Sequence, residues 1–286
     1  MSLLQILLLA MVQGAAELLP VSSSAHVIVA EKLLGLDPTR PEMTLLLVML
    51  HTGTMVAVIL YFWRAWRENY FSSRRELRNF AQRVAVATVL TGIIGLALKF
   101  LIEKFALRGV PHAEIELIFG NLALIGISLG VVGLLIIYAG LRAERPGHPS
   151  RQTLQGSALI GVVQGLCLPF RGFSRSGATI STGLILGINK ARVEEFSFAL
   201  AVVLTPPVIA REVWRLLKAQ AVSPAPGAGL FALFLPSLLG MVFSCLAGLL
   251  ALRWLTRWLE QGRWQLFGIY CLVASAGVLW LYKLGF

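Results

Sequence analysis

The sequence predicts an all-α polytopic membrane protein with six transmembrane helices and two re-entrant helix hairpins, arranged as an inverted-topology repeat. Of its 286 residues, 57% are apolar and only 14% are charged, whereas about 25% of residues are charged in soluble domains. The charges lie in short connectors between long apolar runs. We therefore expect lipid to be the solvent for most of the surface, and the whole chain, 1–286, to be one membrane domain.

Six segments are long and apolar enough to span a bilayer, because a spanning helix needs about 20 largely apolar residues. They are Thr44–Trp63, Val84–Ile102, Leu117–Leu141, Phe196–Ala210, Leu230–Leu252 and Trp264–Tyr282. The fourth is short and contains Pro206-Pro207, so its end is expected to be broken or kinked.

Two further regions, 3–36 and 156–188, are apolar but interrupted. The first is broken by Pro20-Val-Ser-Ser-Ser-Ala-His26 and the second by Pro169-Phe-Arg-Gly-Phe-Ser-Arg-Ser-Gly177. Each half is too short to cross alone, and two short helices joined by such a turn are typical of a re-entrant hairpin. Both regions also share a Val-Gln-Gly start, at Gln13 and Gln164. The chain therefore divides into two predicted repeats, 1–141 and 142–286.

The distribution of arginine predicts the orientation. The connector after the first span, 64–83, holds the densest basic cluster in the chain, so it is predicted to be cytoplasmic. Alternation then makes the first hairpin enter from outside and the second from inside, with both termini outside. Inverted repeats of this kind place their site near the midplane, where the broken helices meet.

The net charge of +11 does not predict nucleic-acid binding, because the basic residues are not gathered in one stripe with aromatics. They are interpreted as topology signals and as partners for anionic membrane lipids. The three cysteines lie in apolar stretches without metal-ligand spacing, so neither a disulfide framework nor a zinc site is expected. No Lys or Arg precedes Lys32, so the first apolar run is expected to remain in the mature protein.

The first hairpin carries the residues with the clearest chemical potential. Gln13 and Glu17 are four residues apart, so they share one face of a helix. A glutamate in so apolar a segment is costly unless it faces a cavity, a metal or a partner. Glu17 is interpreted as a hard-cation ligand or an acid/base group with Gln13 as a neutral oxygen donor, or else as a residue near the interface that reaches water.

Ser22-Ser23-Ser24-Ala25-His26 places a hydroxyl three residues from an imidazole at the start of a short helix. This arrangement suits a nucleophile and its base, and the helix start offers free N–H groups to an anion. The alternative is an ordinary serine cap with a structural histidine. His51 precedes Gly53-Thr54 in the first predicted span, and its side chain is a further candidate to line the cavity.

Arg175 is the most informative residue of the second hairpin, because a guanidinium there needs an anion and its planar donors suit a phosphate. Ser174, Ser176 and Thr179 add hydroxyls, while Gly177 lets the backbone approach closely. The alternative for Arg175 is an ion pair with Glu17. Arg171 is a second cation, which either reaches the cavity or extends toward the interface.

These motifs resemble the undecaprenyl-diphosphatase family of the bacitracin-resistance type. The resemblance rests on Glu17-Leu-Leu-Pro-Val-Ser-Ser-Ser-Ala-His26 and Gly172-Phe-Ser-Arg-Ser-Gly-Ala-Thr-Ile-Ser181, and it covers essentially the whole chain. It implies a multi-pass phosphatase of the bacterial inner membrane, with its active site toward the outer face. Such an enzyme removes the terminal phosphate of a C55 prenyl diphosphate and so regenerates the lipid carrier for cell-wall synthesis.

The resemblance also implies site roles. It maps Glu17, Ser23, His26 and Arg175 to the family's catalytic residues, and Gln13 to the first position of its acidic motif. From their own chemistry, Glu17 and Gln13 are expected to hold Mg²⁺ or Ca²⁺. The residues expected to bind the phosphates are Ser22, Ser24, Ser174, Ser176, Gly177, Thr179 and Arg171. Ser23 would attack with His26 taking its proton, or a metal-bound water would attack instead. Where the family motif usually has Pro before Gly172, this chain has Arg171. The family's exact substrate preference is therefore not carried over to this chain.

A transporter or flippase for a phosphorylated prenyl lipid is the alternative function, because paired broken hairpins in an inverted repeat are also a transporter architecture. The Ser/His/Glu cluster favours the enzyme, since a carrier needs no nucleophile. The sequence does not fix the oligomeric state, and a homodimer is one assembly open to it.

Overall fold

The structure is a computed structural model of residues 1–286. It describes all residues except 18, 107, 109–114, 144–151, 223–229 and 262–263, together with the side chains of 106, 143, 219–220, 222, 230–233 and 252–261. The described residues form helices and no strand. The helices are α1 (Leu3–Glu17), α2 (Ser23–Leu33), α3 (Pro41–Asn69), α4 (Arg74–Leu101), α5 (Leu122–Ala143), α6 (Leu154–Cys167), α7 (Arg175–Ile185), α8 (Lys190–Val222), α9 (Leu230–Gln261) and α10 (Trp264–Lys283), with a π turn at Ile102–Ala106 and a 3₁₀ turn at Ile115–Ile118.

Several helices begin at residues that cap them in the expected way. The side chains of Ser73, Thr153 and Ser174 each accept a hydrogen bond from the backbone N–H three residues later. Such caps satisfy one of the free donors at a helix start. The short helices α2 and α7 both end at a glycine with positive φ, Gly35 at 71° and Gly187 at 78°, a conformation that glycine adopts without strain.

Six of the described helices are long and apolar enough to cross a membrane: α3, α4, α5, α8, α9 and α10. This confirms the six predicted spans. The third of them, α5, begins at Leu122 and not at the predicted Leu117, because residues 115–118 form a separate 3₁₀ turn. The predicted break at Pro206-Pro207 is wrong, since α8 continues through both prolines to Val222. Thr205 Oγ donates to the carbonyl of Ala201 at 2.8 Å, one of the ways in which membrane helices accommodate proline.

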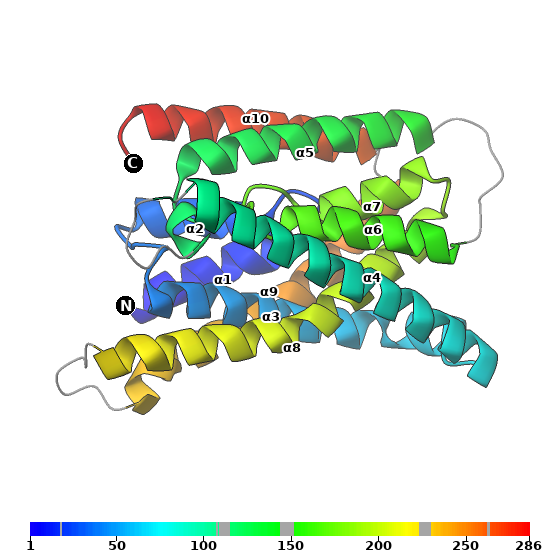
Figure 1. Ribbon diagram of the computed structural model, residues 1–286, viewed down its shortest axis with the longest axis horizontal. Helices are drawn as coiled ribbons and strands as arrows, with labels where there is room; N and C mark the ends of the chain where they lie inside the picture. Colours follow the sequence, from blue (N-terminus) through cyan, green and yellow to red (C-terminus); the bar gives the residue numbers. More distant parts are fainter. Residues whose placement is uncertain (18, 107, 109–114, 144–151, 223–229, 262–263) are drawn as a thin grey trace.

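The two pairs of short helices extend toward opposite ends of the bundle (Figure 1). The α1–α2 pair occupies the half near the N-terminus, the α6–α7 pair occupies the other half, and their turns meet between them. The hydroxyls of Ser22 and Ser24 both donate to the carbonyl of Arg171, at 2.8 and 2.9 Å. These bonds join the two turns, which lie about 150 residues apart in sequence.

The longer helices surround these pairs. Helix α1 packs on α9, α6 on α4, α3 on both α8 and α9, and α5 on α10. Leu9, Leu50, Ile136 and Phe196 are fully buried between them. By contrast, the outer faces of α4, α9 and α10 expose large apolar side chains such as Leu96, Leu250 and Val273, as expected for surfaces in contact with lipid tails. The bundle therefore encloses the junction of the two turns.

Candidate active site

A pocket of about 180 Å³ lies where the two turns meet. Its polar wall comes from the first turn and from the second, while α3 and α8 supply apolar side chains. It is lined by Glu17, Ser22, Ser23, Ser24, Val48, His51, Met55, Cys167, Leu168, Phe170, Arg171, Phe173, Ser174, Arg175, Ser176, Ala201, Leu204, Thr205 and Val208. Such a combination suits a ligand with a charged head and an apolar tail.

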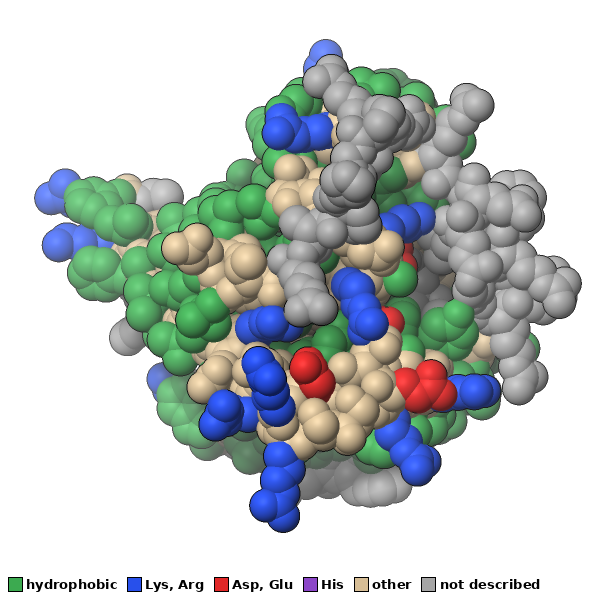
Figure 2. Space-filling view, turned by 90° about the vertical axis from the view of Figure 1, so that its right-hand side faces the viewer, with side chains coloured by type: hydrophobic (Ala, Val, Ile, Leu, Met, Phe, Trp, Pro, Cys, Tyr) green, Lys and Arg blue, Asp and Glu red, His purple; other side chains and the backbone are tan. Residues whose placement is uncertain are grey.

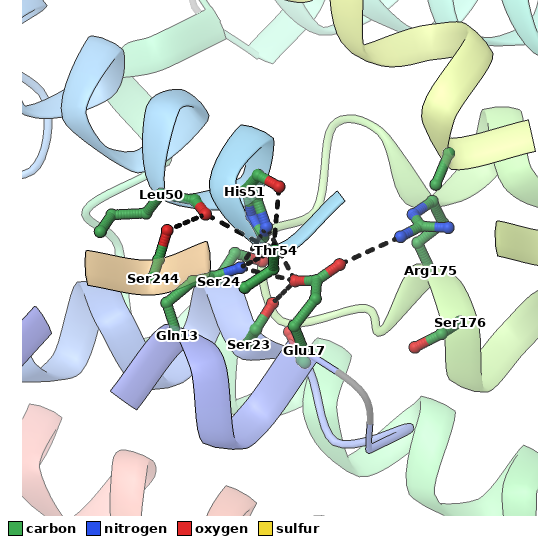
Figure 3. A network of polar contacts seen from close by, with 12 residues as sticks. Gln13, Glu17, Ser23, Ser24, Leu50, His51, Thr54, Arg175, Ser176 and Ser244 are labelled. Carbon is green, nitrogen blue, oxygen red and sulfur yellow. Dashed lines mark hydrogen bonds and ion pairs between the residues drawn. The ribbon is translucent and has the colours of Figure 1, made fainter. Parts of the chain in front are cut away.

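Glu17 is the centre of the polar network (Figure 3), with a side chain only 4% exposed. Its Oε2 accepts a hydrogen bond from Ser23 Oγ at 2.6 Å and from Gln13 Nε2 at 2.7 Å. Its Oε1 accepts a hydrogen bond from Arg175 at 3.2 Å. The alternative in which Glu17 simply reaches water does not describe this carboxylate, because both oxygens are engaged by protein donors.

His51 joins the same network from α3. Its Nδ1 lies 2.8 Å from Glu17 Oε2 and 2.6 Å from Gln13 Nε2. The ring therefore either donates to the carboxylate or accepts from the amide, depending on its tautomer. The sequence indicated only that His51 could line the cavity. Its contact with Glu17 depends on how α3 packs beside α1, for which the sequence carries no local signal.

Arg175 forms the only bridge from the second hairpin to Glu17 among the described side chains. It begins α7, and its other guanidinium nitrogen donates to the carbonyl of Ser197 on α8 at 3.3 Å. The predicted alternative, an ion pair between Arg175 and Glu17, is thus present. With 22% of the side chain exposed, the guanidinium also faces the pocket, so the pair does not prevent it from binding an anion.

His26 is placed differently from its predicted partnership with Ser23. Its Nδ1 lies 2.8 Å from the carbonyl of Ser22, and its Nε2 lies 2.8 Å from the hydroxyl of Tyr270 on α10, with the two rings stacked. The residue does not line the pocket. It lies outside because a position three residues after Ser23 on α2 faces α10, while Ser23 faces Glu17.

The hydroxyl residues predicted to bind phosphate fall into two groups. Those that begin α2 and α7 reach the pocket: Ser22, Ser23 and Ser24 on one side, Ser174 and Ser176 on the other. Gly177 and Thr179 do not line it. Gly177 packs against the carbonyl of Pro20, and Thr179 Oγ lies 2.6 Å from Ser197 Oγ, so these two hold the turn in place.

The starts of α2 and α7 therefore converge on one pocket. Each helix has 11 residues, and its first N–H groups carry partial positive charge. Ser22 makes no side-chain cap bond, despite its position before α2. The N–H groups of Ser23 and Ser24 therefore remain available, whereas that of Ala25 donates to the carbonyl of Ser22. Two helix starts and an arginine give the pocket the donors that a phosphate needs.

The donors suited to a hard cation are few. Gln13 Oε1 is a buried oxygen without a hydrogen-bond partner among the described atoms, whereas Nε2 of the same amide faces the Glu17 carboxylate. Gln13 itself does not line the pocket. In the described part of the chain, no group of three or more His, Cys, Asp or Glu side chains is arranged so that it could hold a metal ion. Magnesium commonly takes one or two carboxylates and completes its shell with phosphate oxygens and water. Glu17 and Gln13 fit that pattern, with the substrate supplying the rest.

Known proteins are similar to this chain along nearly its whole length. Residues 6–277 match the family model described as bacitracin resistance protein BacA. The chain is 57% identical to undecaprenyl-diphosphatase 2 of Acinetobacter baylyi, over 98% of both chains. It is 34% identical to the undecaprenyl-diphosphatase of Thermus thermophilus, over 94% of both, and 32% identical to undecaprenyl-diphosphatase 2 of Burkholderia ambifaria. With a buried Glu–Ser–Arg pocket and matches of this extent, the chain belongs to the BacA family of bacitracin resistance proteins.

Proposed function

We propose that this protein is an undecaprenyl-diphosphatase, which hydrolyses the C55 prenyl diphosphate to the monophosphate and inorganic phosphate. The observation that carries the proposal is the convergence of Ser23, Glu17 and Arg175 on one pocket with an apolar wall. The relatives named undecaprenyl-diphosphatases support the same activity. In a bacterial inner membrane, this reaction returns the lipid carrier to cell-wall synthesis.

The geometry favours a serine nucleophile whose proton passes to Glu17. Ser23 Oγ donates to Glu17 Oε2 at 2.6 Å, the arrangement of a nucleophile with its base. In this mechanism Ser23 Oγ bonds to the terminal phosphorus while the bond from that phosphorus to the bridging oxygen breaks. The lipid monophosphate leaves, and water then releases phosphate from the serine. Arg175 and the starts of α2 and α7 stabilise the added charge.

Direct attack by water is the second chemistry, with Ser23 binding the phosphate instead of attacking it. The two routes differ in whether a phosphoserine forms. Brief incubation with substrate labelled in its terminal phosphate, followed by acid quenching, labels the protein only on the serine route. We expect label on the wild type and none on Ser23→Ala. A label that persists in Ser23→Ala would contradict the serine route.

A bound Mg²⁺ or Ca²⁺ would be held by Glu17 and by Oε1 of Gln13. When bound, such an ion offsets negative charge on the phosphate oxygens. Gln13→Leu removes the neutral oxygen and leaves the carboxylate, so it should raise the metal concentration needed for half-maximal activity by about tenfold. An unchanged metal dependence in Gln13→Leu would exclude this ligand set.

We also propose that α1–α2 and α6–α7 are re-entrant hairpins of an inverted repeat, with residues 1–141 and 142–286 as its halves. Their packing partners correspond, because α1 packs on α9 as α6 packs on α4. The glycines that follow Gln13 and Gln164 also occupy corresponding positions. A Cβ on Gly14 would meet Ala247 of α9, and a Cβ on Gly165 would meet Ile94 of α4. Gly35 and Gly187 end α2 and α7 alike.

The proposed orientation places the 64–83 end in the cytoplasm and the pocket mouth toward the outer face. Figure 2 views the end of the bundle at the right of Figure 1, where Lys and Arg side chains gather with few acidic ones. Such a face suits the cytoplasmic side. Both chain ends lie at the opposite end of the bundle (Figure 1), in agreement with termini outside.

Phosphate release by the purified protein tests the function. The protein is supplied with a C55 prenyl diphosphate in detergent, and lipid translocation is followed in liposomes. We expect the wild type to release phosphate and both Glu17→Ala and Arg175→Ala to lose at least 100-fold in rate. Full activity in both variants would refute the site. Translocation by a wild type that releases no phosphate would favour the transporter.

A further inference from the structure

We propose that Arg171 is a second phosphate-binding residue, which holds the phosphate that stays on the lipid and so selects a diphosphate over simpler phosphates. This inference rests on the proposed function and assigns the other half of the substrate head. In the proposed mechanism Arg175 stabilises the charge at the terminal phosphate and Glu17 takes the proton of Ser23. Neither residue binds the phosphate that is attached to the lipid.

Arg171 is fixed at the pocket wall by its backbone. Its carbonyl accepts the hydroxyls of Ser22 and Ser24, on either side of Ser23. The next residue, Gly172, lies against the backbone of Ile125 on α5, where any Cβ would collide with the carbonyl. These contacts hold residue 171 beside the proposed nucleophile, and its side chain lines the same pocket.

The guanidinium of Arg171 is held by an aromatic ring, and its Nε donor is not used in a hydrogen bond to the described protein atoms. It stacks on the ring of Phe119, with 4.0 Å between its central carbon and the ring centroid. Its Nε is buried without a hydrogen-bond partner, and no ion pair to a described carboxylate lies within 4.0 Å. A stacked arginine with free donors in a pocket is suited to a planar or tetrahedral oxyanion.

Three carboxylates act electrostatically on Arg171 from its surroundings: Glu212, Glu116 and Glu31. Arg211 pairs with both Glu116 and Glu212, and Arg215 lies 3.8 Å from Glu212, so these two carboxylates have cationic partners of their own. Glu31 is 1% exposed, and neither of its oxygens has a hydrogen-bond partner among the described atoms. The guanidinium therefore lies in acidic surroundings, but it forms no ion pair within 4.0 Å among the described residues.

The two arginines line the same pocket. Arg175 also contacts Ser197 of α8, and Ala201, Leu204, Thr205 and Val208 of that helix form the pocket wall. The head of a prenyl diphosphate has two phosphates joined by one oxygen. With the terminal phosphate at Ser23 and Arg175, the lipid-attached phosphate faces Arg171, and the apolar residues of α3 and α8 accept the start of the chain.

The experiment compares three affinities in the full-length protein: the KM for a C55 prenyl diphosphate, the inhibition constant of the C55 monophosphate, and that of inorganic phosphate. Arg171→Gln should raise the first two by about 10- to 100-fold, as expected when a charged hydrogen bond to phosphate is lost. The inhibition constant of inorganic phosphate, which occupies the terminal site, should change less than about threefold. Arg64→Gln removes an exposed arginine that pairs only with Glu68 among the described residues, and should leave all three unchanged.

Arg171→Lys keeps the charge but loses the forked donors, so its KM should lie between those of the wild type and Arg171→Gln. It also provides a folded variant if Arg171→Gln proves unstable in detergent. Unchanged constants in Arg171→Gln, or an equal loss for all three ligands, would overturn the proposal. Neither result would affect the proposed function, which fails only if the wild type releases no phosphate.

Discussion

At the scale of single residues, the site is organised around one buried carboxylate. Glu17 accepts hydrogen bonds from Ser23, Gln13 and Arg175 and contacts His51. A buried carboxylate with several donors stays in one orientation, which is what a base or a metal ligand requires. The pocket is therefore preorganised before any substrate arrives.

The sequence predicts the local part of this site, which consists of residues close together in the chain. Gln13 and Glu17 share a helix face, and Ser23 and Arg175 begin short helices, so their spacing identifies them as candidate site residues. The partners of His26 and His51 depend on tertiary packing. His26 meets Tyr270, which is 244 residues away, and His51 reaches Glu17 only because α3 lies beside α1.

The contacts of His26 predict a positioning role. Its ring nitrogen Nδ1 forms a hydrogen bond with the carbonyl of Ser22. The backbone of Ser22 has a φ of 65°, which is unusual for a residue other than glycine. His26→Ala should lower kcat by about tenfold by loosening the turn that carries Ser23. His26→Asn, which can still donate to that carbonyl, should recover most of the activity. If His26→Asn is as inactive as His26→Ala in phosphate release, the imidazole itself takes part in proton transfer.

At the scale of helices, close packing fixes the position of the short pairs. A Cβ on Gly161 of α6 would collide with the backbone of Ala87 on α4, so small residues set the distance between these helices. The sequence predicted the short helices from their breaks. It did not predict the continuity of α8 through two prolines, because a helix held by neighbours tolerates missing hydrogen bonds that would break an isolated one.

This packing makes a testable difference between two glycines. Gly161→Ala should destabilise the protein by about 1–3 kcal/mol, since backbone atoms cannot move aside. Gly92→Ala is the control, because Gly92 lies in α4 with nothing within 4 Å of the added carbon; alanine there favours the helix slightly. Thermal unfolding in detergent measures both. Equal melting temperatures for the two variants would contradict the close approach of α4 and α6.

At the scale of the whole molecule, the two halves contribute unequally to one pocket. The first supplies Glu17 and Ser23, and the second supplies Arg175 and Arg171, the residue that departs from the family motif. Their turns meet because the helix pairs enter from opposite ends of the bundle (Figure 1). The sequence predicted opposite directions of entry because three spans separate the two interrupted regions, whereas the size and lining of the pocket follow from all the helices together.

The proposed orientation predicts which loops react with an impermeant thiol reagent in intact cells. In a variant lacking Cys167, Cys245 and Cys271, Asp37→Cys between α2 and α3 should be labelled from outside. Ser72→Cys, between α3 and α4, should be labelled only after the cells are permeabilised. Both positions are exposed or partly exposed, so accessibility is matched. The reverse pattern would invert the topology.

The central claim, that Glu17 and Arg175 meet across the halves and serve one reaction, is tested most directly by a double-mutant cycle. Stability and phosphate release are measured for Glu17→Gln, Arg175→Gln and the double variant. Arg175→Gln strands the buried Glu17 carboxylate and should destabilise by about 3–5 kcal/mol. Glu17→Gln leaves a guanidinium that is partly exposed and should destabilise by less, whereas the double variant should regain most of the stability lost in Arg175→Gln. All three should release phosphate at least 100-fold more slowly than the wild type. Additive losses of stability, or an active double variant, would contradict the account.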